Sequence, residues 1–475
     1  MEVGPSLVTT DATTTKGIWA AFREAIRGSS LDYTTAPIGR CIVMLAVPMV
    51  MEMAMESIFV VADVFWVAHL GANAVATVGL TESMLTLVYS LAMGVSIGAT
   101  ALVARRIGEG DSEGAARAGV QSIALGVIVS LLIGVFGGWN ASHLLRLMGA
   151  SDEVVATGST YARVMFGGNA TIILLFLINA VFRGAGDAAI AMRVLWLGNA
   201  INIVLGPCLI FGPGPFPALG VTGAAVATNI GRGTAVLVQL LTLTRWSTRV
   251  RLARRHLGLD ASAMGTVLRL SGSGTVQILI ATASYVALVR ILSHFGSAAL
   301  AGYTIGIRLI IFALLPSFGI SNAAATMVGQ NLGARKPDRA EKAVWTAAFY
   351  NLIFLGVVGI VFLAAADLIV SFFTSDSTVA SYAVSCLRIV SLGFVFYAYG
   401  MVITQSFNGA GDTWTPTLIN LLVFWAIELP LAWVLSHGGG LGARGVFVAL
   451  AACYSLLAVV SAVVFRRGRW KTKAI

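Results

Sequence analysis

Three carboxylates occupy one face of the first long apolar segment, where they could bind protons or cations. The segment PMVMEMAMESIFVVADVFWVAHLG (48–71) contains Glu52, Glu56 and Asp63. At ~100° per residue in a helix, Glu56 and Asp63 lie about 40° and about 20° around the axis from Glu52, so all three project from one stripe. Charged groups are costly in lipid, so this stripe must face protein or water. A desolvated carboxylate can exchange a proton near neutral pH, and a cation can replace that proton. We therefore expect Asp63, Glu52 and Glu56 to form a coupling-ion site.

A structural role is the alternative for the same acids. They could pair permanently with an arginine on a neighbouring helix, and Arg232 is the best candidate. For Asp63 we favour the ion site, whereas for Glu52 and Glu56 both interpretations stay open. Glu82 is expected near the outer end of the second apolar segment, where it could simply reach the membrane interface.

Polar, methionine and aromatic residues in other apolar segments could line a substrate cavity. Asn199 and Asn202 lie in GNAINIVLGP (198–207), and each needs a hydrogen-bond partner at that depth. Methionine and aromatic faces suit large apolar or cationic ligands, although such residues more often pack only against lipid or other helices. Besides Asn199, the cavity candidates are Met53, Tyr397, Trp425 and Glu428.

The composition requires these residues to sit in a membrane. Of 475 residues, 57% are hydrophobic and 11% are charged, whereas a soluble chain has about 25% charged residues. Each apolar segment is long enough to cross a bilayer. The remainder is loops, which leaves no room for a soluble catalytic domain and argues against an enzyme. We predict twelve spans, at 41–67, 79–104, 118–138, 160–182, 189–212, 220–243, 266–293, 300–330, 343–363, 384–407, 415–435 and 441–465.

The net charge of +10 is explained by the orientation of the chain in the membrane. Most of the 31 Lys and Arg residues fall in the termini and in alternate loops, as expected if both termini are cytoplasmic. This pattern argues against nucleic-acid binding and predicts a multi-pass protein of the inner (plasma) membrane. Residues 1–39 form a polar amino-terminal segment in which KGIWAAFREAIRG (16–28) is predicted to be a short amphipathic helix at the membrane surface. The four cysteines show no metal-binding spacing, and no metal or cofactor is expected.

The sequence contains one fold twice. The halves are about 40–245 and 268–465, joined by a basic linker (246–267) and followed by a basic tail (466–475). Each half has an even number of spans, so both enter the membrane from the same side, and a pseudo-twofold axis along the membrane normal relates them. This geometry suits alternating access between two lobes. At a constant offset of 225 residues, HLGANAVA (69–76) matches HFGSAALA (294–301), GATALVARRIGEG (98–110) matches AAATMVGQNLGAR (323–335), and FRGAGD (182–187) matches FNGAGD (407–412).

The repeat is not uniform in charge. At this offset Asp63 corresponds to Leu288, so the acidic stripe belongs to one half only. The two GAGD motifs fall at inner turns, where Gly is expected to end one helix and Asp to cap the next. A role in an inner gate is a second interpretation of these turns.

Several motifs resemble the multidrug and toxic compound extrusion (MATE) transporters over essentially the whole chain. They occur in the family's expected order: ADVFWVAHLG (62–71), ARRIGEGD (104–111), FRGAGD (182–187), NIVLGPCLIFG (202–212) and GVTGAAVAT (220–228). The resemblance implies an all-α fold of twelve spans and a V-shaped cavity between two lobes. It also implies a drug/cation antiporter in which protonation or Na⁺ occupancy of Asp63 drives export, with Asn202 nearby.

The chain departs from the family pattern at two places. Gly206 stands where many relatives have Asp, and spans seven and ten lack the carboxylates of the NorM-like branch. The chain therefore resembles the DinF-like branch more closely, and H⁺ is favoured over Na⁺. We expect a monomeric exporter of amphiphilic or cationic small molecules. The alternatives are a lipid or lipid-linked-precursor flippase of the same superfamily and an intramembrane transferase, although the sequence lacks the acid-rich or His–acid motifs that a transferase needs.

Overall fold

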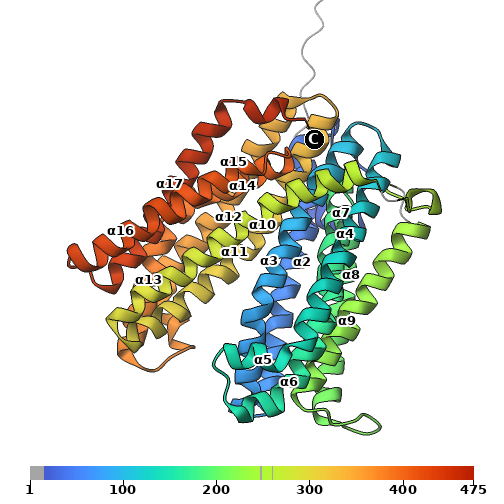
Figure 1. Cartoon of the computed structure of the whole chain (residues 1–475). Coiled ribbons are helices and arrows are strands. Elements are labelled where there is room, and N and C mark those ends of the chain that lie inside the picture. The colour runs from blue at the N-terminus through green and yellow to red at the C-terminus, as the bar shows by residue number, and fades with distance from the viewer. Residues whose placement is uncertain (1–14, 247–248, 259, 475) are drawn as a thin grey trace, which may run out of the picture.

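The chain folds into a bundle of long helices (Figure 1). The computed structural model describes residues 15–246, 249–258 and 260–474, and these ranges contain no strand. The first 14 residues of the predicted amino-terminal segment lie outside the described chain. The amino-terminal half contains α1 (Thr15–Arg27), α2 (Ile38–Ala68), α3 (Ala72–Gly108), α4 (Ser112–Trp139), α5 (Ala141–Leu147), α6 (Asp152–Gly167), α7 (Asn169–Ala185), α8 (Ala188–Phe211) and α9 (Val221–Leu241). The carboxy-terminal half contains α10 (Ala261–Leu292), α11 (Ser297–Gly333), α12 (Pro337–Ser371), α13 (Ser377–Leu392), α14 (Phe394–Gly409), α15 (Trp414–Asn420), α16 (Leu429–Trp433) and α17 (Ala443–Arg466), with π-helical stretches at Leu421–Glu428 and Val434–Gly438.

The predicted all-α membrane architecture is confirmed. Within the described ranges, eleven helical segments are long and apolar enough to cross a membrane. The pair α13–α14 adds a twelfth span if it is counted as one segment with a bend of 61°. The chain is therefore an integral multi-pass membrane protein. The predicted tenth span (384–407) exists, but its bend was not expected from the apolar pattern.

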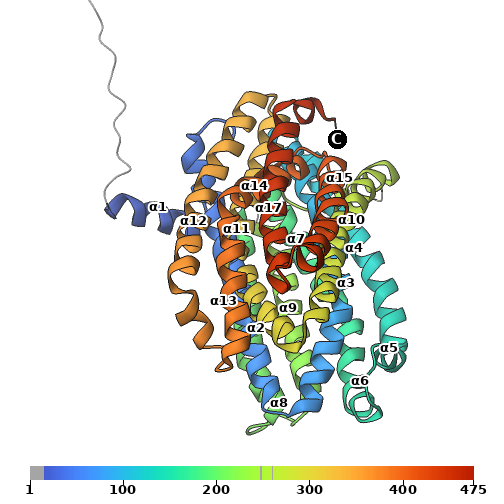
Figure 2. The ribbon, with the colours of Figure 1, turned by 90° about the vertical axis from the view of Figure 1, so that its left-hand side faces the viewer.

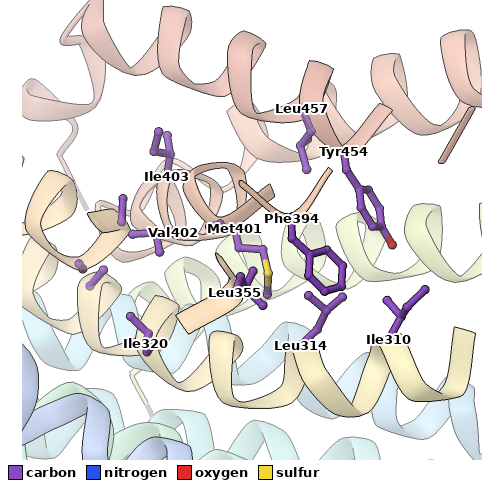
Figure 3. Close-up of a cluster of buried hydrophobic side chains, with 14 of the residues drawn as sticks. Ile310, Leu314, Ile320, Leu355, Phe394, Met401, Val402, Ile403, Tyr454 and Leu457 are labelled. Atoms are coloured by element: carbon purple, nitrogen blue, oxygen red, sulfur yellow. The ribbon is translucent and has the colours of Figure 1, made fainter. Parts of the chain in front are cut away.

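Close packing explains the bend at Gly393, which separates α13 from α14. A β-carbon at this position would lie 3.0 Å from the carbonyl oxygen of Ala451 on α17, so a larger residue would push the two helices apart. The next residue, Phe394, is fully buried. Figure 3 shows its ring within a cluster that includes Leu314 and Leu355. The bend thus directs an aromatic ring into the core of the carboxy-terminal half.

The helices form two lobes, each with its own apolar core. One core is built mainly by α3 to α9 together with Val267 of α10, and the other mainly by α10 to α17. Helix α2 belongs to both lobes, because Cys41, Leu45 and Met49 from its first half join the carboxy-terminal core whereas Val67 near its end joins the amino-terminal core. In agreement with this division, α2 packs against both α8 and α11. Below, the N-lobe denotes α3 to α9 with the second half of α2, and the C-lobe denotes α10 to α17.

The lobes touch at the end of the bundle that carries the carboxyl terminus, and their ribbons diverge toward the opposite end (Figure 1). Close backbone approaches make these contacts. A β-carbon at Gly94 of α3 would lie 2.5 Å from the backbone nitrogen of Thr275 on α10, and one at Gly329 of α11 would lie 2.6 Å from the β-carbon of Ala104 on α3. Glycine therefore permits the lobes to meet here. We call this end the terminus-bearing end.

A short segment between α1 and α2 connects the two lobes at the terminus-bearing end. Tyr33 is buried and its hydroxyl donates to the Gly186 carbonyl of the N-lobe at 3.2 Å. Its own carbonyl accepts from the Asn331 amide of the C-lobe at 3.3 Å, and the Lys336 ammonium donates to the Thr34 carbonyl at 2.9 Å. Figure 2 shows α1 projecting sideways from the bundle, directly before this segment.

The two GAGD turns lie at the same end, and their aspartates form ion pairs. Gly186 adopts a left-handed conformation (φ 88°) and ends α7, as predicted. The predicted capping role is wrong for Asp187, because its side chain makes no cap hydrogen bond and instead pairs with Arg249 at 3.2 Å. Burial raises the pKa of Asp187 to about 6, although Arg249 opposes this shift. Its repeat counterpart Asp412 pairs with Lys473 at 3.4 Å, so a basic residue that follows the last span of each half holds each turn.

Candidate functional site

A buried arginine lies at the centre of the acidic region in the N-lobe. Arg232 of α9 is 5% exposed, and its Nη2 lies 3.5 Å from Glu56 Oε1 on α2. Its Nη1 donates to the Tyr89 hydroxyl of α3 at 3.0 Å. The other oxygen of Glu56 accepts from the amide of Asn199 on α8 at 3.1 Å. Groups from α8 and α9 therefore hold the Glu56 carboxylate, and Tyr89 of α3 holds its arginine partner. Glu56 thus forms the arginine pair that the structural alternative predicted.

Asp63 occupies a different environment on the same helix. Its side chain is partly buried, and in the described parts of the chain it has no hydrogen bond and no ion pair within 4.0 Å. Arg232 and Glu82 nevertheless lie close enough to interact with it electrostatically. Glu82 thus belongs to the acidic region, whereas the sequence had suggested the membrane interface. Of the three acids on the stripe, Asp63 is the one for which the described chain shows no hydrogen bond or ion pair.

Glu52 belongs to a separate buried network. Its side chain is 2% exposed, and its Oε1 accepts from the Asn179 amide at 3.0 Å and lies 3.4 Å from Arg183 Nη1. The Asn179 carbonyl in turn accepts from Gln239 at 2.5 Å. Glu52 Oε2 has no partner among the described side chains. The sequence grouped Glu52 with Glu56 and Asp63, but their partners separate them into three environments.

The Glu52 network reaches the contact between the lobes. The carbonyl of Arg183 accepts from the Thr326 hydroxyl of α11 at 3.2 Å, and that of Gly184 accepts from the Gln330 amide at 2.9 Å. Arg183 therefore binds a carboxylate with its side chain and the opposite lobe with its backbone.

The predicted site residue Asn202 is buried, and Gly206 follows it by four positions on α8. Its amide donates to the Thr228 hydroxyl on α9 at 2.8 Å. A β-carbon at Gly206 would meet nothing nearer than the Asn202 side-chain oxygen and the Trp66 ring, both at 4.0 Å. The site therefore has space for a larger side chain at position 206.

The C-lobe contains the buried acid Glu428 on a π-helical stretch. The side chain is 2% exposed, its Oε2 accepts from the Ser284 hydroxyl at 2.8 Å, and its Oε1 has no partner among the described residues. Tyr397 stacks on Tyr454 nearby, with ring centroids 3.9 Å apart. The charge of Glu428 acts on both tyrosines. An aromatic region with one carboxylate thus lies inside the C-lobe.

Matching indole hydrogen bonds relate Glu428 to the N-lobe site. Trp196 Nε1 donates to the Met51 carbonyl and Trp425 Nε1 to the Ile280 carbonyl, each at 3.0 Å and each across 145 residues of chain. Glu428 follows Trp425 by three positions, as Asn199 follows Trp196. These bonds imply a local offset of 229 residues in this region (196 to 425), so the offset of 225 does not hold there. Glu428 is therefore the C-lobe counterpart of Asn199.

The predicted substrate-cavity residues do not form one cluster. Met53 and Asn199 lie in the N-lobe and Tyr397, Trp425 and Glu428 in the C-lobe. Asn199, Glu428 and Tyr397 are largely enclosed, whereas Trp425 is 42% exposed. A ligand that touched both groups would have to lie between the lobes.

Comparison with known proteins identifies the family. The family described as MatE matches residues 48–208 and 275–434, one stretch in each half of the chain. The chain belongs to the MatE family. A probable multidrug resistance protein YoeA of Bacillus subtilis is 26% identical over 442 residues, covering 92% of this chain and 95% of the relative. The multidrug export protein MepA of Staphylococcus aureus is 23% identical and covers 90% and 94%.

Solved MATE structures share the fold. A crystal structure of MATE in the straight conformation superposes with a TM-score of 0.87, at 26% identity, over 95% of this chain and 99% of the other. A probable multidrug resistance protein NorM of Thermotoga maritima is similar at 25% identity over 91% of this chain. The names of these relatives agree on the family but do not distinguish its DinF-like branch from its NorM-like branch.

Several polar residues of this MatE chain escaped the sequence analysis. Tyr89, Asn179, Gln239 and Thr228 complete the hydrogen bonds described above, yet each looks ordinary in the sequence. Arg183 could have been recognised from the sequence, because it directly precedes the repeated GAGD motif and its repeat counterpart, at position 408, is Asn. No group of three or more His, Cys, Asp or Glu side chains in the described ranges is arranged to hold a metal ion.

Proposed function

We propose that this MatE transporter exports amphiphilic, often cationic small molecules by antiport against H⁺ or Na⁺. Relatives named multidrug resistance and multidrug export proteins support the substrate class. The observation that carries the ion-coupling role is the state of Asp63, a partly buried carboxylate without a hydrogen-bond partner in the described chain. Such a group can gain or lose an ion without breaking an existing pair, which is what a coupling site requires.

The position of the lobe contacts supports an alternating-access cycle. If the terminus-bearing end is cytoplasmic, as the basic loops predict, the lobes are closed on that side and separate toward the outside. H⁺ or Na⁺ would bind Asp63 in this state and weaken the binding of cargo. Coupling requires the ion and the substrate to favour different conformations, because a ligand shifts an equilibrium only by its differential affinity.

Charge supports the choice of cationic cargo. Glu56, Asp63 and Glu82 outnumber the one arginine among them, and Glu428 has no cationic partner among the described side chains. Aromatic rings at Tyr397 and Trp425 could receive the apolar part of a ligand. The greater similarity to the DinF-like branch, the monomeric state, the inner-membrane location and the cytoplasmic termini belong to the same proposal.

Transport in proteoliposomes tests this function. Wild type, Asp63→Asn and a control, Asp152→Asn, would be assayed for export of cationic dyes under an imposed pH gradient or Na⁺ gradient. The control is suitable because the Asp152 side chain is 99% exposed and far along the chain from the site. We expect Asp63→Asn to abolish gradient-driven export and Asp152→Asn to retain it. Equal export by Asp63→Asn and wild type would refute the role of Asp63, and movement of labelled lipid without dye export would favour the flippase alternative.

A further inference from the structure

Arg232 places a positive charge within the acidic region. It is buried in the N-lobe among groups from α2 and α3. Its guanidinium carbon lies 5.4 Å from the centre of the Phe59 ring and 5.7 Å from that of Tyr89, so two aromatic faces hold the charge in place. Together with the contacts to Glu56 and the Tyr89 hydroxyl, these rings immobilise the guanidinium.

We propose that Arg232 is a built-in cation that restricts the coupling ion of this transporter to a proton. The inference rests on the proposed antiport function and concerns only which ion is used. Arg232 would be a specificity-determining residue, because it touches neither the ion nor the cargo but sets the charge beside Asp63.

The charges around Asp63 come from α2, α3 and α9. Glu56 lies on the same helix, Glu82 on α3 and Arg232 on α9, and all three act electrostatically within the region. The charges of Asp63 and Glu82 also act on the phenol of Tyr161 on α6. Arg232 already forms an ion pair with Glu56, so Asp63 and Glu82, which make no ion pair within the described chain, are the acids left for an external ion.

A proton and a sodium ion place different demands on this site. A proton needs one carboxylate oxygen and no further ligand, so it can bind Asp63 beside a guanidinium. Na⁺ needs several oxygen ligands at once, and Arg232 both repels it and occupies the oxygens of Tyr89 and Glu56.

Apart from the Glu82 carboxylate, the nearby polar side chains do not supply further ligands. The second oxygen of Glu56 accepts from Asn199, and the Thr228 hydroxyl accepts from Asn202. Gly206 contributes no side-chain oxygen at all. Removal of the guanidinium would therefore free oxygen ligands and remove a positive charge in the same step.

Replacement of Arg232 provides the test. Full-length Arg232→Gln, Arg232→Lys and the exposed-arginine control Arg163→Gln would be reconstituted, and dye export and sodium-22 movement measured under pH and Na⁺ gradients. We expect wild type, Arg232→Lys and Arg163→Gln to respond to the pH gradient alone. Arg232→Gln is expected to gain Na⁺-driven export at least tenfold above the wild-type response to Na⁺, with a smaller response to the pH gradient.

Two outcomes would overturn the inference without touching the antiport function. One is Na⁺-driven export by wild type, and the other is a folded Arg232→Gln protein that still ignores Na⁺. If Arg232→Gln does not fold, the double variant Glu56→Gln/Arg232→Gln replaces it, because it leaves neither member of the pair charged. A Na⁺-insensitive double variant would also overturn the inference. Gradient-driven export by Asp63→Asn would instead refute the proposed function itself.

Discussion

The close approach of α3 and α10 makes Gly94 a sensitive position for the conformational equilibrium. In Gly94→Ala the new β-carbon would lie 2.5 Å from the Thr275 nitrogen and 2.7 Å from its Cα. An ordinary contact starts at about 3.4 Å, so the helices must separate by roughly 1 Å or the lobes must part. Gly79 on the same helix provides a matched control, because a β-carbon added there would meet no atom within 4 Å.

The magnitude follows from the difference between the two variants. Both substitutions change helix propensity equally, so that effect cancels. What remains is overpacking in Gly94→Ala, which costs about 1–3 kcal/mol and applies only when the lobes meet at the terminus-bearing end. We therefore expect the population closed at this end to fall by about 5- to 150-fold relative to Gly79→Ala.

Spin-label distances can measure this shift. Cysteines at Ala72 and Ser297, which are exposed and repeat-equivalent at the opposite end of the two lobes, would carry labels in a background without the native cysteines. Double electron–electron resonance in nanodiscs should show a new, shorter distance between the two spin labels in Gly94→Ala and the wild-type distance in Gly79→Ala. Identical distance distributions in the two variants would refute the argument that glycine sets this contact.

Three further predictions concern stability and ion specificity. The folded pKa of Asp187, about 6, lies above the ordinary value of 3.8, so its contribution to stability is complete below pH 3.8 and is lost as the pH rises through 6. The melting temperature of wild type minus that of Asp187→Asn should therefore decrease over this range, and a flat difference would contradict the shift. Glu52→Gln leaves Arg183 with a buried unpaired charge and should destabilise the protein by about 3–5 kcal/mol in detergent melting; an unchanged melting temperature would show that the pair is dispensable. Gly206→Asp should fold normally, because there is space beside Asn202, and should increase Na⁺-driven export; reduced thermal stability would show that the space is too small for the carboxylate.

The sequence predicted the architecture because apolar length and repetition directly encode it. Twelve apolar segments and three matches at one offset are enough to specify two lobes of six spans. The bend at Gly393 was not predictable in this way, because it depends on the approach of Ala451 from another span. The ion pair of Asp187 was missed for the same reason, since its partner Arg249 lies far along the chain.

The candidate site was only partly predictable. Helical periodicity placed Glu52, Glu56 and Asp63 on one face of a helix, and the structure agrees with that placement. Their separate roles depend on which side chains face them from α7, α8 and α9, and single-sequence periodicity carries no information on how those helices are rotated. The sequence suggested Arg232 as a partner for the acids, because a charge inside a span needs a partner. Only the structure shows that this partner is Glu56 and not Asp63.

The division of α2 between two cores has a mechanical consequence. When the lobes reorient, α2 must bend, slide along its neighbours or lose the packing contacts of one of its halves. Pro48, which lies near the boundary, cannot donate a hydrogen bond to Met44, so flexing there costs less than elsewhere along the helix. One continuous helix therefore joins the carboxylates of α2 to the apolar side chains that its first half contributes to the carboxy-terminal core. Under the proposed antiport mechanism, a change caused by ion binding at Asp63 can therefore reach the opposite lobe along this helix, without passing through any loop.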